Sequence, residues 1–97
     1  MKINFTGHGL DVTPALEQFT NDKFAKLEKH FSRMTFINVT FHIENILQVA
    51  EANLGVYKNE LHARAEANDM YAAVEMLVDK LDKQLIKYKE KSQDHRE

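Results

Sequence analysis

Residues 37–44 constrain the fold more than any other part of this sequence, because apolar and polar side chains alternate there without interruption. The apolar positions are Ile37, Val39, Phe41 and Ile43, and polar residues separate them. A period of two is typical of a β-strand that has one face against a core and one face in water. The chain therefore needs a second layer to cover the apolar face.

Two segments have the three-and-four spacing of amphipathic helices and can supply that layer. The first is predicted to begin at Pro14, capped by Thr13, and to end near Phe31. The second is predicted to begin after Asp69 and to fray beyond Lys91. The apolar stripes comprise Leu16, Phe19, Thr20, Phe24, Leu27 and Phe31 in the first helix, and Met70, Val74, Leu77, Val78, Leu81, Leu85 and Tyr88 in the second.

Three further stretches alternate as strands do, namely residues 2–6, 52–56 and 61–67, and the last two form a predicted hairpin joined at Lys58-Asn59. The expected fold is α+β with the order β-α-β-β-β-α. Both helices cover one face of a four-stranded sheet, an arrangement that resembles a double-stranded RNA-binding domain. The other face is left to solvent, with Asn4, Thr6, Asn38, Thr40, His42, Tyr57, His62 and Arg64 on it.

The length of 97 residues fits one domain, predicted over residues 1–91 with a short loose tail at 92–97. With no cysteine, the chain can form neither disulfides nor thiolate metal sites. No stretch approaches the ~20 apolar residues of a membrane helix, and the N-terminus lacks the layout of a secretory signal. We therefore expect a cytoplasmic protein with no membrane partner.

The net charge of −2 gives no overall positive field, so any nucleic-acid surface must be local. Two groups of basic residues segregate on the helices, each within roughly 60–80° of the surface at 100° per residue. Parallel helices would place the two groups side by side, as ridges that suit a phosphate backbone. The alternative is that these are ordinary solvated lysines next to acidic neighbours. The groups are Lys26, Lys29 and Arg33, with Lys23 nearer the apolar edge, and Lys80, Lys83, Lys87 and Lys91.

The sequence gives only weak signals for metal, cofactor or catalytic sites. The five histidines lack metal-ligand spacing, and no phosphate-binding loop or nucleophile motif occurs, so neither a cofactor nor a metal is expected. A small enzyme using His42 and His62 with Glu44 or Glu66 remains the catalytic alternative. With only Tyr57 expected on the open sheet face, a base-stacking platform there is not supported. The ring of Tyr71 could face either the core or a partner.

Several segments together resemble bacterial ribosome hibernation factors, the family of the hibernation promoting factor, protein Y and the sigma-54 modulation proteins. The resemblance covers residues 1–91, with its most specific part in the last helix. The matching segments are Ile3–Gly7, Val12–Leu16, Lys23–Glu28, Asp69–Val74, Asp79–Leu81, Gln84–Leu85 and Lys87.

This resemblance implies a β-α-β-β-β-α fold and a non-catalytic protein that occupies the messenger and transfer RNA channel of the small ribosomal subunit. It further implies inhibited translation and inactive ribosome pairs in stationary phase or stress, as for the short promoting members. The implied partners are the small subunit with its rRNA and whole ribosomes, without a small-molecule substrate. A general double-stranded RNA-binding module is the alternative. The implied rRNA contacts are Lys23, Lys26, Lys80, Lys83 and Lys87, with Arg33, Arg64, Tyr71 and Lys91 as possible neighbours.

Overall fold

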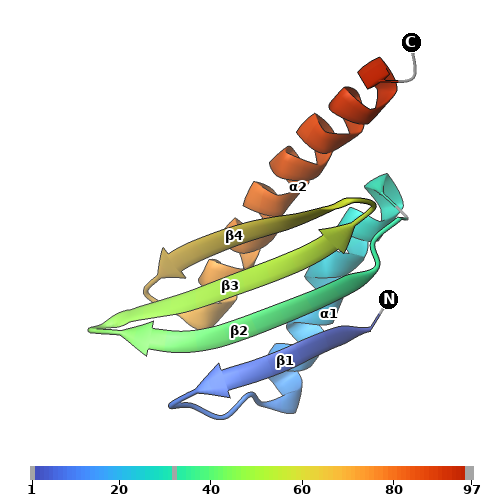
Figure 1. Ribbon diagram of the computed structural model, residues 1–97. Helices are drawn as coiled ribbons and strands as arrows, with labels where there is room; N and C mark the ends of the chain where they lie inside the picture. Colours follow the sequence, from blue (N-terminus) through green and yellow to red (C-terminus); the bar gives the residue numbers. More distant parts are fainter. Residues whose placement is uncertain (1, 32, 96–97) are drawn as a thin grey trace.

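The chain folds into one sheet and two helices in the order that the sequence predicts (Figure 1). The computed structural model describes residues 2–31 and 33–95, with side chains up to Glu90. The element order β-α-β-β-β-α is confirmed. The elements are β1 (Ile3–His8), α1 (Pro14–His30), β2 (Phe36–Glu44), β3 (Leu47–Val56), β4 (Asn59–Ala67) and α2 (Met70–His95).

The four strands lie in the order β1-β2-β3-β4, with β1 parallel to β2 and the remaining pairs antiparallel. The turn between β3 and β4 is Tyr57-Lys58, and Lys58 adopts a φ of 62°. The predicted junction at Lys58-Asn59 was therefore wrong by one residue. Asn59 instead opens β4, where its side-chain oxygen accepts a hydrogen bond from the Glu60 amide at 2.8 Å.

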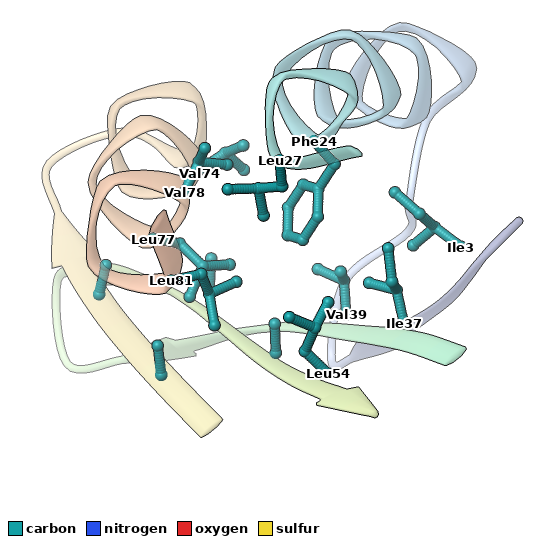
Figure 2. Packing of buried hydrophobic residues seen from close by; sticks show 14 of the residues in the cluster. Ile3, Phe24, Leu27, Ile37, Val39, Leu54, Val74, Leu77, Val78 and Leu81 are labelled. Atoms are coloured by element: carbon teal, nitrogen blue, oxygen red, sulfur yellow. The ribbon is translucent and has the colours of Figure 1, made fainter. Parts of the chain in front are cut away.

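Both helices cover the same face of the sheet, as predicted, and the core lies between the two layers (Figure 2). Phe24 and Leu27 of α1 are buried there together with Leu77 and Leu81 of α2. The helices begin where the sequence indicates, since the Thr13 hydroxyl accepts from the Leu16 amide at 3.1 Å. The amphipathic stripes therefore position the two helices side by side over the strands.

Helix α2 continues to His95, which is further than expected. The prediction had this helix fray beyond Lys91, within the stretch assigned to a loose tail. Residues 91–95 contain neither glycine nor proline, so no local signal ends the helix there. Within residues 2–31 and 33–95, neither helix has an apolar stretch suited to crossing a bilayer.

Candidate nucleic-acid interface

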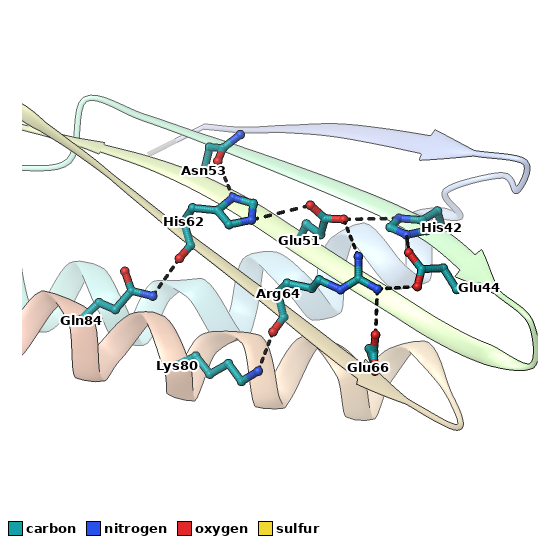
Figure 3. A network of polar contacts seen from close by, with 9 residues as sticks. All are labelled: His42, Glu44, Glu51, Asn53, His62, Arg64, Glu66, Lys80 and Gln84. Carbon is teal, nitrogen blue, oxygen red and sulfur yellow. Dashed lines mark hydrogen bonds and ion pairs between the residues drawn. The ribbon is translucent and has the colours of Figure 1, made fainter.

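One side of α2 carries three exposed lysines, which we call the α2 lysine flank: Lys80, Lys83 and Lys87. This flank borders β4, because the Lys80 ammonium donates to the Arg64 carbonyl at 2.6 Å (Figure 3). Gln84 extends the same contact by donating to the His62 carbonyl at 2.8 Å. These two hydrogen bonds satisfy carbonyl groups of the edge strand β4, whose unpaired backbone groups could otherwise pair with a strand of another molecule. Lys80 therefore has a structural contact in addition to its charge.

Lys83 and Lys87 differ from Lys80 because they are exposed and form no ion pair or hydrogen bond within the described part of the chain. A lysine without a carboxylate partner retains its full charge for an external anion. Their spacing of four residues places them one helical turn apart on the same side. Within the described part of α2, this pair is therefore free to bind an external anion.

The lysines of α1 differ from the α2 lysine flank, because one of them faces α2 and is paired there. Lys23 is partly buried and pairs with Glu75 of α2 at 3.1 Å. Lys26 is exposed, and one turn further along His30 contacts Asp82 at 3.0 Å. Lys23 and His30 therefore face the side of α2 that carries Glu75 and Asp82.

That the two basic groups form adjacent ridges for RNA stays a prediction. At 100° per residue, the side of α2 that faces α1 and the α2 lysine flank are separated by roughly 130° around the helix axis. The first side carries Glu75 and the second carries Lys80, which reaches β4 instead. Glu75 and Asp82 therefore lie on the side of α2 nearest to α1, away from the α2 lysine flank.

The possible neighbours of the predicted rRNA contacts occupy different parts of the molecule. Arg33 is exposed just after α1, and Tyr71 lies against Phe19 between the helices. Arg64 is on the open face of the sheet, in the layer opposite the helices (Figure 3). The side chain of Lys91 lies outside the described residues.

Arg64 is the centre of a polar network on this open face. Its guanidinium donates to Glu44 at 2.5 Å and to Glu66 at 2.7 Å, with Glu51 at 3.4 Å. Hydrogen bonds lower the pKa of the Glu44 carboxyl to about 2, with the largest effect from Arg64 and the next largest from His42. Glu44 and Glu66 in turn raise the pKa of Arg64 further above its usual range. Three carboxylates surround one arginine, so the face is acidic.

The histidines proposed for catalysis belong to this network. His42 contacts Glu44 at 2.9 Å, whereas His62 contacts Asn53 at 2.7 Å and lies 3.8 Å from Glu51. The described residues contain no cluster of histidine and acidic side chains that could hold a metal ion. Sequence reasoning overlooked Glu51, although it alternates with Ala50 and Ala52 and so shared a face with the predicted open positions. The arrangement links strands β2, β3 and β4 through ion pairs.

The Glu44→Gln variant is expected to lose less stability in acid than the wild type. Folding lowers the pKa of Glu44 from 4.5 to about 2, so the unfolded chain binds more protons than the folded protein between these values. The stabilisation is complete above the unfolded pKa and is lost as the pH falls through the folded pKa. The melting temperatures of the two proteins should therefore converge as the pH falls from 7 to 2.

A Glu60→Gln variant is the matched control, because Glu60 is exposed on β4 and forms no ion pair within the described residues. Its melting temperature should keep a nearly constant offset from that of the wild type across the same pH range. A constant offset for Glu44→Gln as well would show that the Arg64 contact does not stabilise the fold.

Comparison with known proteins identifies the family. Residues 3–93 match the family described as Sigma 54 modulation protein / S30EA ribosomal protein. The chain belongs to this family. It is 45% identical over 95 residues to the ribosome hibernation promoting factor of Klebsiella oxytoca, covering 98% of this chain and 100% of that protein. The Azotobacter vinelandii protein of the same name is 50% identical over 91 residues, with 94% and 85% covered. The resemblance seen in the sequence is thereby confirmed.

Solved structures of the S30EA type have the same fold. A ribosomal subunit interface protein from Coxiella burnetii superposes with a TM-score of 0.87 at 36% identity, covering 92% of this chain and 98% of that one. The N-terminal domain of Thermus thermophilus Protein Y gives a TM-score of 0.82 at 23% identity, over 91% and 99% of the two chains. Members of the S30EA family thus share the two-layer arrangement, and the similar proteins carry names of ribosomal factors, not of enzymes.

Proposed function

We propose that this S30EA family member is a cytoplasmic ribosome hibernation factor. It binds the small ribosomal subunit in the channel for messenger and transfer RNA, inhibits translation and favours inactive ribosome pairs in stationary phase or stress. The names of its relatives support the ribosomal role, at 45% and 50% identity over nearly the whole chain. The observation that carries the binding mode is the α2 lysine flank, where two exposed lysines have no partner within the described residues.

In this proposal, the α2 lysine flank contacts phosphates of the rRNA. Lysine ammonium groups neutralise phosphates and release counterions without reading the base sequence. Lys26 contributes from α1, and Lys23 does so by exchanging Glu75 for a phosphate. Arg33 and Lys91 are further candidates. The acidic face around Arg64 repels phosphates, so the domain presents its helical side to the RNA.

Co-sedimentation with purified small subunits and whole ribosomes tests the proposal. We expect the protein to travel with small subunits at low salt and to be released as salt rises, because each phosphate contact makes the affinity fall with salt. Part of the ribosomes should shift to a heavier, paired species. A protein that stays at the top of the gradient in low salt would overturn the ribosomal role.

The second candidate function is general binding of double-stranded RNA. The α2 lysine flank is compatible with it, because lysines contact phosphates without reading the bases. Free duplex RNA of about 16 base pairs, the span typical of such modules, separates the two functions. Binding to the duplex as tight as to small subunits would favour the general module. Much weaker duplex binding is the result expected of a hibernation factor.

A further inference from the structure

Two aromatic rings are in contact where the first turn of α2 meets α1. Tyr71 of α2 and Phe19 of α1 meet edge to face, with centroids 4.9 Å apart and an interplanar angle of 83°. Phe19 is partly buried against the core, whereas Tyr71 is 42% exposed. An edge-to-face partner fixes the orientation of the Tyr71 ring while leaving part of its surface in solvent.

Lys23 and Glu75 lie next to the two rings. The Lys23 ammonium lies 5.3 Å from the centroid of the Phe19 ring and 3.1 Å from a Glu75 carboxylate oxygen. Tyr71 and Glu75 are four residues apart in α2 and so lie on the same side of the helix. The ion pair offsets the charge of Lys23, which leaves little net charge on this pair beside the rings, in contrast to the α2 lysine flank.

We propose that Tyr71 is a stacking surface for one unpaired base of RNA. This inference rests on the proposed ribosomal function and deepens it by assigning different RNA groups to the two sides of α2. A neutral aromatic surface suits a base, which is uncharged and has a π-face, better than it suits a phosphate. The uncompensated lysines of the flank suit the backbone.

Exposure alone does not make a tyrosine a stacking surface, as Tyr57 shows. It is 64% exposed, but it lies in the β3–β4 turn, with the Lys58 ammonium 5.4 Å from its ring centroid and no aromatic ring against it among the described side chains. The two tyrosines are therefore a matched pair for substitution, because both are exposed and, of the two, Tyr71 rests on another ring.

The test measures the affinity of the full chain for purified small ribosomal subunits at several salt concentrations. Removing a stacked base contact typically weakens binding by about tenfold, and we expect this loss for Tyr71→Leu and for Tyr71→Gln. Tyr71→Phe keeps the ring and should bind as the wild type does. Tyr57→Leu should also leave the affinity unchanged. Thermal unfolding shows which variants are folded. If one of the two non-aromatic variants, Tyr71→Leu or Tyr71→Gln, does not fold, the other is used.

The salt dependence distinguishes stacking from a charge effect. A base contact involves no counterion release, so Tyr71→Leu should lower the affinity by the same factor at every salt concentration. A changed slope would mean that the substitution disturbs phosphate contacts, and it would overturn the proposal. If the folded Tyr71→Leu and Tyr71→Gln variants bind with wild-type affinity, the stacking proposal is also overturned. The ribosomal function then stands, since the wild type still binds. If the wild-type protein itself does not bind small subunits, the proposed function is refuted instead.

Discussion

Replacement of Lys80, Lys83 and Lys87 together by glutamate is expected to abolish binding to small ribosomal subunits. Three phosphate contacts contribute roughly a hundredfold to a thousandfold in affinity near ~0.1 M salt, and charge reversal adds repulsion to their loss. The slope of log affinity against log salt should also become shallower by about two to three. Equilibrium binding to purified subunits across a salt series measures both quantities.

Two controls separate charge from structure in this experiment. The Lys80 ammonium also covers the Arg64 carbonyl of β4, so the double variant Lys83→Glu/Lys87→Glu removes only lysines without a partner in the described chain. The pair Lys2→Glu/Lys58→Glu makes the same change in net charge at exposed sites before β1 and in the β3–β4 turn. Binding that falls equally in both double variants would mean that only net charge matters. An unaffected triple variant would place the RNA surface elsewhere.

The elements of the fold could be predicted because each one has a single apolar face. The alternation around Val39 and the stripe around Leu81 each leave only one way to bury these residues, and both are fully buried. The errors lay at element ends, where local preferences are weak. Strand β3 begins at Leu47, before the alternation that predicted it from residue 52. The turn at Tyr57-Lys58 was assigned one residue too late, and α2 extends beyond Lys91 because its sequence there lacks a breaker.

The candidate site was harder to predict, because it depends on how elements pack against each other. Periodicity grouped Lys80 with Lys83, but it gave no information on which side of α2 faces α1. That side is set by how the apolar stripes of both helices pack together over the sheet, which brings Lys23 next to Glu75, a residue far away in the sequence. The Arg64 network likewise depends on strand register, which pairs Glu51 with Arg64 across β3 and β4.

The slightly acidic net charge conceals a spatial separation of charges. Glu44, Glu51 and Glu66 gather around Arg64 on the sheet, whereas the α2 lysine flank lies in the helical layer. The sum over the chain therefore hides a difference in charge between the two faces. For a protein that approaches RNA from one side, the distribution of charge determines orientation, and the total does not.

The Phe24→Ala variant is expected to lose about 3–5 kcal/mol of unfolding free energy, the cost typical of removing a buried aromatic ring. Phe24 is 2% exposed and fills the space between α1 and strand β2, which carries Ile37 and Val39 (Figure 2). Domains of this size are stable by only about 5–15 kcal/mol, so the variant should be close to unfolding at 37 °C. Urea denaturation followed by circular dichroism measures the change.

Ile86→Ala is the matched control for this core prediction, because Ile86 also lies on a helix but is 46% exposed. Truncation at an exposed site removes little buried area and should cost less than about 1 kcal/mol. A loss for Phe24→Ala as small as that of Ile86→Ala would mean that the helices close over the missing ring. Because Phe19 of α1 contacts Tyr71, such a shift of α1 would also change the contact between the helices. Small-subunit binding by Phe24→Ala, measured at low temperature, would report whether α1 can move on the sheet without changing that contact.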